Sequence, residues 1–248
     1  MRKVTVTRYV TPLREGGSLP AIVEGDDNGL YVLKFRGAGQ GARALVAELV
    51  AGELARAIGL SVPEIVLAEL DPDLARTEPD PEIQELIRAS AGLNLALDYL
   101  PGSVTFDPVA DAPDGFLASS VVWFDALTMN IDRTAKNTNL LLWHGQLWMI
   151  DHGAALYFHH GSEDFLSRAR DPFPAIKDHV LLRFANALEE ADTVLCERAT
   201  ESRVREIVAD IPADWSPHAQ RYADFFRARL EAPRPFLEEA VRARAQQL

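Results

Sequence analysis

The chain has 248 residues, of which 48% are hydrophobic and 25% are charged. This balance is ordinary for a folded globular protein and excludes a disordered, collagenous or coiled-coil chain. Asp and Glu outnumber Lys and Arg by 37 to 25, a formal net charge of −12, so we expect no nucleic acid and no anionic membrane among its partners.

Further classes of protein are excluded by what the sequence lacks. Its single cysteine, Cys196, excludes a disulfide framework and a cysteine-ligated zinc site, and it fits a reducing compartment. No apolar run approaches the roughly 18 residues that indicate a transmembrane helix. The N-terminus alternates apolar and polar residues without an apolar block, so we expect no signal peptide and a cytoplasmic protein.

The first part of the chain is predicted to consist mainly of strands. Alternating apolar and polar residues, or short apolar runs between turn signals, predict strands over residues 3–10, 20–24, 30–36, 64–70 and 93–99. Between them, residues 42–58 are rich in Ala and Leu and predict a helix that Gly59 closes. The acids and prolines of 71–81 predict a solvated loop, and Asp80-Pro81-Glu82 predicts the capped start of another helix.

The second part of the chain is predicted to be mainly helical. Residues 116–129 predict an apolar helix and 139–150 a hairpin, and long amphipathic helices are expected over 178–210 and 217–247. Because strands and helices are segregated, we expect an α+β protein with two lobes, joined near Pro101-Gly102. The N-lobe would span residues 1–97, with an antiparallel sheet and one long helix, and the helical C-lobe residues 98–248.

The predicted hairpin contains the most informative residues. Its turn at His144-Gly145 suits a tight two-residue connection, which pairs Trp143 with Gln146 and Leu140 with Met149. The same register brings Asp151 within one residue of being opposite Asn137, and opposed residues have Cβ atoms roughly 5 Å apart. A carboxylate and an amide oxygen side by side suit Mg²⁺ when a nucleotide supplies the other ligands.

A second acid belongs to the same region. Asp132 lies five residues before Asn137, in an irregular loop, close enough to share the pocket. Asp and Asn are common in loops for turn reasons alone, so the pair by itself indicates little. The apolar hairpin with Asp151-x-Gly153 at its far end makes coincidence a much poorer explanation.

Lys34 is the candidate phosphate ligand. It shares a strand face with Val32 and Arg36, where an exposed lysine would be unremarkable, but the chain has only four lysines against 21 arginines. A compact ammonium can contact phosphate oxygens and needs a carboxylate to fix it. The helix at 42–58 offers Glu48 and Glu53, and periodicity does not choose between them.

Other motifs are weaker or absent. Gly16, Gly17 and Ser18 form a turn before a strand, which could let backbone N–H groups approach phosphates. The P-loop, His-Glu-x-x-His and Gly-x-Ser-x-Gly patterns are missing. His152, His159 and His160 make no clean ligand set, and we expect them in a solvated loop.

The order of these residues resembles the protein-kinase-like fold: Lys34 on a strand, an acid on the next helix, Asp132-x-x-x-x-Asn137, then Asp151-x-Gly153. More specifically, it looks like the compact branch of the HipA-like kinases. That resemblance covers about residues 15–220 and includes Lys34-Phe-Arg-Gly-Ala-Gly-Gln-Gly41, Glu48 through Gly59-Leu-Ser-Val-Pro63, and Asn130-Ile-Asp-Arg-Thr-Ala-Lys-Asn137.

The resemblance implies an ATP-dependent kinase of protein Ser/Thr hydroxyls that uses Mg²⁺. Asp132 would be the catalytic aspartate that orients or deprotonates the acceptor hydroxyl, while Asn137 and Asp151 would hold the metal. Lys34 would contact the nucleotide phosphates. Glu48 would hold Lys34, and we choose it over Glu53 because its spacing to Gly59 looks like the family's.

The resemblance also implies the rest of a nucleotide site. Asp98, Tyr99 and Leu100 would be the hinge beside adenine. Gly16, Gly17 and Ser18 would cover the phosphates. For Lys136, neutralising phosphate charge and simple solvation remain even alternatives.

Two alternative functions stay open. The Asp-Arg-x-x-x-Asn segment is also similar to phosphatidylinositol 3-/4-kinases, so the acceptor could be a lipid or a small-molecule hydroxyl, although the acidic charge disfavours an anionic lipid. A pseudokinase that binds nucleotide as a regulatory module is the other alternative. The sequence departs from the kinase pattern in a glycine-poor loop, in Thr134 where related sequences often have histidine, and in Asp-His-Gly in place of Asp-Phe-Gly.

Overall fold

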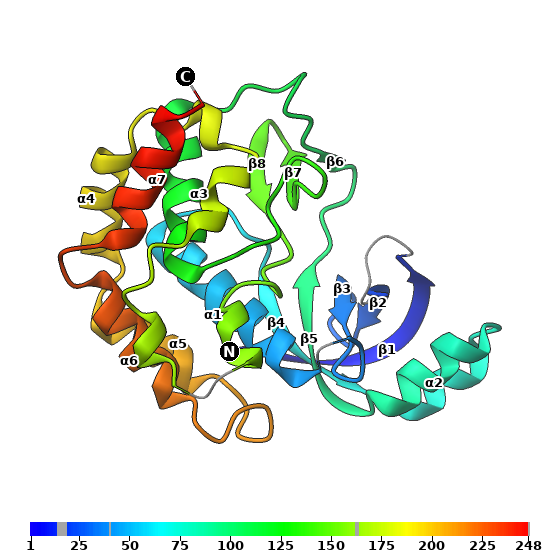
Figure 1. The fold of residues 1–248 in the computed structure, drawn as a ribbon. Coiled ribbons are helices and arrows are strands. Elements are labelled where there is room, and N and C mark those ends of the chain that lie inside the picture. The colour runs from blue at the N-terminus through cyan, green and yellow to red at the C-terminus, as the bar shows by residue number, and fades with distance from the viewer. Residues whose placement is uncertain (14–18, 40, 162–163, 248) are drawn as a thin grey trace.

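The strands of the N-terminal part form a closed barrel. The structure is a computed structural model that describes residues 1–13, 19–39, 41–161 and 164–247. Four of the five strand pairings are antiparallel, as predicted, but β1 and β4 pair in parallel and so close the barrel. Around the barrel the order is β1 (Lys3–Pro12), β2 (Ala21–Gly25), β3 (Leu30–Lys34), β5 (Gly92–Asp98) and β4 (Ile65–Leu70) (Figure 1).

The two faces of β3 point to different cores. Tyr31 and Leu33 belong to the cluster of buried residues that fills the barrel. Lys34 is on the opposite face and pairs with Leu95 of β5, which belongs to the larger core outside the barrel. α2 (Pro81–Ala89) adds its apolar side to the barrel cluster and lies away from the other helices (Figure 1). The outer face of β3 therefore presents Lys34 toward the rest of the molecule.

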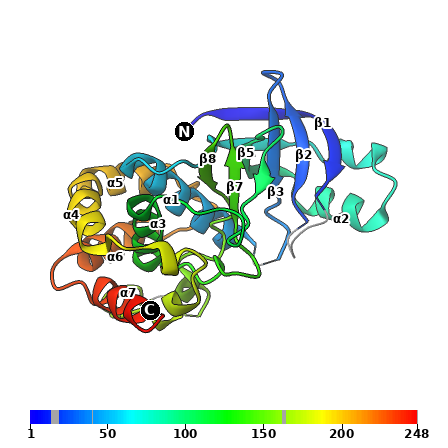
Figure 2. The same cartoon turned by 90° about the horizontal axis from the view of Figure 1, so that it is seen from above.

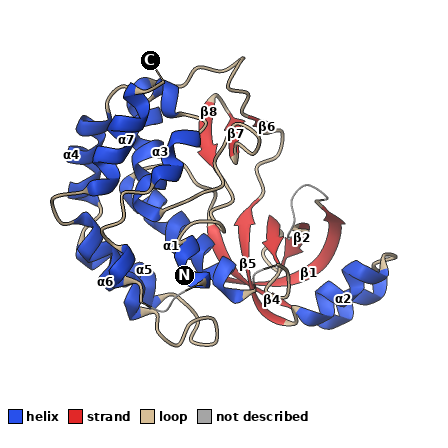
Figure 3. Ribbon diagram, in the orientation of Figure 1, coloured by secondary structure: helices blue, strands red, loops and turns tan. Residues whose placement is uncertain are grey.

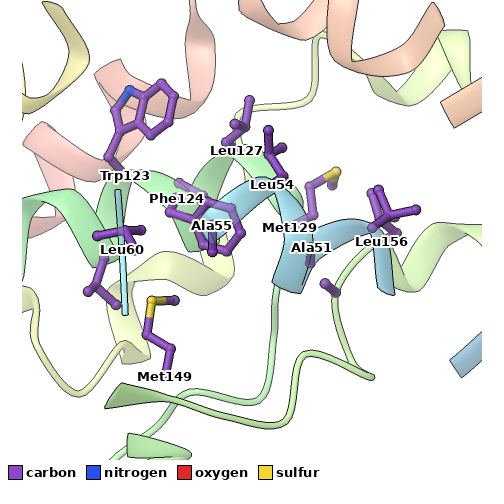
Figure 4. Packing of buried hydrophobic residues seen from close by; sticks show 14 of the residues in the cluster. Ala51, Leu54, Ala55, Leu60, Trp123, Phe124, Leu127, Met129, Met149 and Leu156 are labelled. Atoms are coloured by element: carbon purple, nitrogen blue, oxygen red, sulfur yellow. The ribbon is translucent and has the colours of Figure 1, made fainter. Parts of the chain in front are cut away.

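α1 (Ala42–Ile58) has the predicted bounds and lies between the barrel and the other helices (Figure 2). Gly59 ends it in a left-handed conformation, φ 97°, with its N–H bonded to the carbonyls of Ala55 and Arg56. Most of the helix surface is buried, because β4 and β5 of the barrel and the later helices α4 (Leu188–Arg198) and α5 (Glu201–Ala209) pack against it. Figure 4 shows its Leu54 and Ala55 near Phe124, a residue of α3 (Gly115–Thr128).

The helices of the C-terminal part are shorter than predicted. Two continuous helices over 178–210 and 217–247 are wrong: Thr200 caps a new helix through its side chain, and the second range is interrupted at Pro233 and Pro235. The helices gather on one side of the molecule (Figure 3) and are α3 (Gly115–Thr128), α4 (Leu188–Arg198), α5 (Glu201–Ala209), α6 (Gln220–Leu230) and α7 (Pro235–Ala245).

Short 3₁₀ helices fill several connections. One of them occupies part of the predicted solvated loop at 71–81, where the Asp71 side chain caps it. Their bounds are Pro72–Thr77, Tyr157–His160, Leu166–Arg168, Pro174–Asp178 and Leu182–Phe184. Within the described residues, no helix is both long and apolar enough to cross a bilayer.

The predicted hairpin is confirmed with its register. β7 (Leu140–Trp143) and β8 (Gln146–Met149) pair Leu140 with Met149 and Trp143 with Gln146. A third strand, β6 (Val104–Thr105), extends this sheet and was not predicted, because two residues carry no periodicity. The sheet lies between the barrel and the helices (Figure 1).

Candidate active site

Lys34 joins three elements of the fold. At the end of β3, its Nζ lies 2.9 Å from Oε2 of Glu48 on α1 and 2.5 Å from Oδ1 of Asp151, which follows β8. The Lys34 and Glu48 side chains are only 12% and 1% exposed, whereas that of Asp151 is 44% exposed. Glu53, the other candidate on α1, pairs instead with Arg56 at 2.8 Å. The ammonium group therefore lies between one buried and one accessible carboxylate.

The Lys34–Glu48 pair is held in its charged form. Burial by itself would lower the pKa of Lys34, but the charges of Glu48 and Asp151 outweigh it and raise that pKa above its usual value. Burial would likewise raise the pKa of Glu48, but Lys34 and His152 bring that pKa well below its usual range. The Lys34 ammonium is consequently charged and held in place by the Glu48 carboxylate at neutral pH.

The expectation that the histidines lie in a solvated loop is wrong for His152 and His159. His152 is fully buried: its Nδ1 lies 3.4 Å from Oε1 of Glu48, and its ring packs edge-on against Phe124. His159 is also buried, with Nδ1 2.9 Å from the Tyr222 hydroxyl. The apolar residues interspersed between these histidines were the signal that this segment enters the core.

Asp132 is held by amide groups at the accessible side of the loop. Its Oδ2 accepts hydrogen bonds from Nδ2 of Asn137 at 2.8 Å and, more weakly, from Nδ2 of Asn139 at 3.3 Å. Asn139 was not singled out in the sequence, where it is one more polar residue before an apolar run. Because the Asn137 nitrogen donates to Asp132, its Oδ1 is the atom left to ligate a metal. Lys136, between these residues, is exposed.

Asn137 and Asp151 do not simply face each other across the hairpin. The pairing continues one step, with the Ile150 N–H bonded to the Asn139 carbonyl at 3.0 Å. Asn139 and Asp151 then adopt positive φ angles of 47° and 54°. The backbone on both sides of the hairpin therefore departs from strand geometry, and the antiparallel pairing ends there. Among the described residues, Asn137 and Asp151 share no hydrogen bond, since one contacts Asp132 and the other Lys34.

The donor set suits one kind of metal site. Within the described residues, no group of three or more His, Cys, Asp or Glu side chains could hold a metal ion by itself. Asp151 supplies a carboxylate and Asn137 an amide oxygen. A hard divalent cation such as Mg²⁺ is bound in this way, by one or two protein oxygens with substrate phosphates and water completing the shell.

The residues predicted to form a hinge, Asp98 to Leu100, lie at the end of β5 and directly after it. Burial and the nearby charge of Glu64 raise the pKa of the Asp98 carboxylate. As the residue after Leu97 on the strand, Asp98 points to the other face of the sheet. The amides of Asp98 and Tyr99 already donate to the carbonyls of Glu64 and Leu30, at 2.8 and 2.9 Å. Leu100 is buried. The other nucleotide-site prediction, for Gly16, Gly17 and Ser18, lies outside the described residues.

A buried polar cluster behind the loop was not predicted. Asp125, Arg133 and His179 are all at most 6% exposed and lie in hydrogen-bond contact. Burial by itself would raise the pKa of Asp125, but the charge of Arg133 and the hydrogen bond from His179 bring it down to about 2. In the sequence, Asp125 stands inside an apolar helix, and a single buried acid there is a signal of this kind.

Comparisons with known proteins show the family and the fold. A family model described as HipA-like kinase matches residues 6–242, whereas no curated protein matches the chain. The Helicobacter pylori proinflammatory kinase CtkA has a similar structure, with a TM-score of 0.61 and 14% identity over 99% of each chain. The Golgi casein kinase with Mn/ADP bound gives a TM-score of 0.56 and 12% identity over 96% of this chain and 73% of that one.

The structural likenesses show the fold, which is an α+β fold shared with kinases. The family model covers nearly the whole chain and includes each described site residue from Lys34 to Asp151. Both results agree with the resemblance seen in the sequence. The chain therefore belongs to the HipA-like kinase family.

Proposed function

We propose that this chain transfers the γ-phosphoryl group of ATP to a Ser/Thr hydroxyl of a protein, with Mg²⁺ as the metal. The observation that carries the proposal is the contact of Lys34 with both Glu48 and Asp151. It brings a strand lysine, a helix acid and a candidate metal ligand together from segments 117 residues apart. A phosphate–metal site needs these same charges in the same place.

The nucleotide would lie between the barrel and the helical part. We assign residues 1–97 and 98–248 to the two lobes of a kinase, with ATP between them. Lys34 would contact the phosphates, and the backbone of Asp98, Tyr99 and Leu100 would lie beside adenine. The segment of Gly16, Gly17 and Ser18 would cover the phosphates.

The metal would be held by Asn137 and Asp151. When bound, Mg²⁺ would neutralise phosphate charge and fix the orientation of the transferred group. The structure of the Golgi casein kinase with Mn/ADP bound supports use of a divalent metal with a nucleotide in this fold. Asp151 already contacts Lys34, so one residue would link the metal to the phosphate-binding ammonium.

Asp132 would act on the acceptor. The acceptor oxygen forms a bond to the γ-phosphorus as the bond from that phosphorus to the bridging oxygen of ADP breaks. The hydroxyl proton passes to the Asp132 carboxylate, whose Oδ2 is oriented by Asn137. Lys136, exposed four residues after Asp132, would offset charge on the transferred group.

The test compares Asp132→Asn with Asp214→Asn, an exposed acid in a turn after α5. With γ-labelled ATP and Mg²⁺, Asp132→Asn should lower phosphoryl transfer by several orders of magnitude while leaving the melting temperature nearly unchanged. Asp214→Asn should behave as the unsubstituted chain does. Unchanged transfer in Asp132→Asn would contradict the assigned role.

A second assay offers γ-labelled ATP together with a protein, phosphatidylinositol vesicles or a small alcohol, and so separates a protein kinase from the alternative functions. Label incorporated into Ser or Thr of a protein supports the proposal, whereas label found only in phosphatidylinositol vesicles or a small alcohol would replace it. Saturable ATP binding without ADP release would identify a regulatory module instead.

A further inference from the structure

Asp125 accepts hydrogen bonds from several sides at the end of α3. Its side chain is fully buried, and its Oδ2 lies 2.6 Å from Nε of Arg133 and 2.9 Å from Nε2 of His179. Its Oδ1 accepts from Nδ2 of Asn130 at 3.2 Å. Both carboxylate oxygens are therefore bonded to residues of other segments or of the adjoining loop.

The first branch reaches Asp132. Asn130 uses its nitrogen to contact Asp125, so its Oδ1 is free to accept the backbone N–H of Asp132 at 3.1 Å. This bond fixes the backbone of the residue that we assign to the acceptor hydroxyl. Asp125 thus acts on Asp132 through one intermediate side chain.

The second branch reaches the metal side. Nη1 of Arg133 donates to the Asn139 carbonyl and, at 3.3 Å, to the carbonyl of Ile150. Ile150 directly precedes Asp151, and the Ile150 N–H itself bonds to the Asn139 carbonyl. The guanidinium of Arg133, which Asp125 holds, therefore links the two segments that carry the candidate metal ligands.

The third branch fixes the cluster from behind. Nδ1 of His179 accepts the N–H of Leu181 at 3.0 Å, so the imidazole proton is on Nε2 and is donated to Asp125. The N–H of Val180 bonds to the Arg133 carbonyl at 3.1 Å. The segment before α4 thereby holds the same loop.

We infer that Asp125 is a positioning residue that aligns Asp132 and Asp151 with each other, through Asn130 and Arg133. This inference rests on the proposed function for the roles of those two acids. A buried ion pair is weak evidence for stability, because apolar residues of similar volume often replace such pairs without loss. Here the branches through Asn130 and Arg133 end on the backbone of a site residue or of its neighbour, which is where alignment is needed.

A matched pair of variants separates alignment from general damage to the core. Asp192 on α4 is also buried, at 5% exposure, and accepts from Trp123 at 2.7 Å and from Arg234 at 2.5 Å. Its hydrogen-bond partners among the described residues are Trp123, Cys196 and Arg234, which lie outside the candidate site. Asp125→Asn and Asp192→Asn therefore remove equivalent buried charges, one behind the site and one away from it.

Turnover is measured with MgATP well below both melting temperatures and is normalised to the folded fraction. Asp125→Asn should lower kcat about 100-fold, the cost of a displacement near 1 Å, whereas Asp192→Asn should keep the normal kcat. His179→Gln, which retains an N–H donor, should keep more activity than His179→Leu. Equal losses in the two aspartate variants, or normal kcat in Asp125→Asn, would overturn the inference.

Amide hydrogen exchange tests the inference without activity. The N–H groups of Asp132 and Ile150 should exchange faster in Asp125→Asn than in Asp192→Asn. If the unsubstituted chain shows no phosphoryl transfer, the proposed function fails, and this exchange comparison alone decides whether Asp125 aligns the two segments. Equal exchange in both variants would then refute the alignment.

Discussion

The two halves of the candidate site are positioned by different means. The strand–helix half, Lys34 and Glu48, stands on the regular elements β3 and α1. The loop half, Asp132, Asn137 and Asp151, stands on backbone outside any helix or strand. Register and helix rotation suffice to bring Lys34 and Glu48 together, whereas the loop half depends on buried polar side chains behind it.

The difference follows from how backbone groups are satisfied. Along β3 and in the interior of α1 the N–H and C=O groups pair within the sheet or the helix, so the side chains need only point correctly. The chain around Asn139 and Asp151 has positive φ angles and leaves the ladder. Its carbonyls are satisfied by Arg133, a buried side chain that is itself held by Asp125. An irregular site therefore requires a polar framework, and a regular one requires mainly packing.

The largest combined effect on activity and stability is expected in the strand–helix half. Lys34→Met removes the contact to phosphate and leaves Glu48 buried without its main partner. We expect phosphoryl transfer to fall about 10²–10³-fold and the free energy of unfolding to drop by about 3 kcal/mol. Lys3→Met is the control, because Lys3 is an exposed strand lysine that pairs with Glu69 and should contribute less than about 1 kcal/mol. Equal stability losses in urea unfolding would show that burial of the pair is unimportant.

The next effect, on stability alone, is expected at Arg229, which packs against the end of α3 just before the loop half. Arg229 on α6 is fully buried and donates to four carbonyls around the end of α3 at 2.7–3.0 Å, those of Ala126, Leu127, Ala169 and Asp171. Arg229→Met should lower the free energy of unfolding by about 3 kcal/mol or more, because these carbonyls lose their partner. Arg227→Met, an exposed neighbour, should change it by less than about 0.5 kcal/mol. Similar melting temperatures for the two variants would contradict this assignment.

The smallest effect concerns acid. Burial, with the charges of His160 and Arg43, lowers the pKa of His159 to about 3, whereas an unfolded histidine titrates near 6.5. Below pH 6.5 this histidine is protonated in the unfolded chain but stays neutral in the folded chain. The free energy of unfolding at neutral pH therefore decreases progressively toward pH 3. Between pH 7.5 and 5.0 this histidine should contribute a loss of about 2 kcal/mol.

The measurement is urea unfolding at both pH values. The loss should shrink by that amount in His159→Phe and stay unchanged in His144→Asn, which removes an exposed histidine from the hairpin turn. An unaltered loss in His159→Phe would show that other groups cause the acid sensitivity.

Local signals in the sequence predicted much of the fold. The bounds of α1 were predicted because Ala and Leu favour a helix and Gly59 ends one, and the hairpin register followed from His144-Gly145. The parallel pairing of β1 with β4 could not be predicted, since it joins Lys3 to Leu67 without a turn between them. The break at Thr200 was missed because apolar periodicity continues across it.

For the candidate site, the sequence indicated which residues to consider, but it could not predict which of them contact one another. The choice between Glu48 and Glu53 depends on the rotation of α1, and a helix buried on most sides gives no such signal. The burial of His152 depends on the path of the chain after Asp151. The role of Asp125 depends on three segments meeting, which no single stretch of sequence encodes.

Closure of the barrel has a consequence for how the protein behaves in a crowded solution. An open sheet ends in strands whose free N–H and C=O groups can recruit strands of other molecules and start aggregation. The pairing of β1 with β4 joins the two end strands at Lys3↔Leu67, Val4↔Ala68 and Thr5↔Glu69, and so occupies part of those edges. In the smaller sheet β6 has only two residues, and beside β8 the Met149 N–H already bonds to the Ser61 carbonyl. These contacts therefore disfavour edge-to-edge association at both sheets.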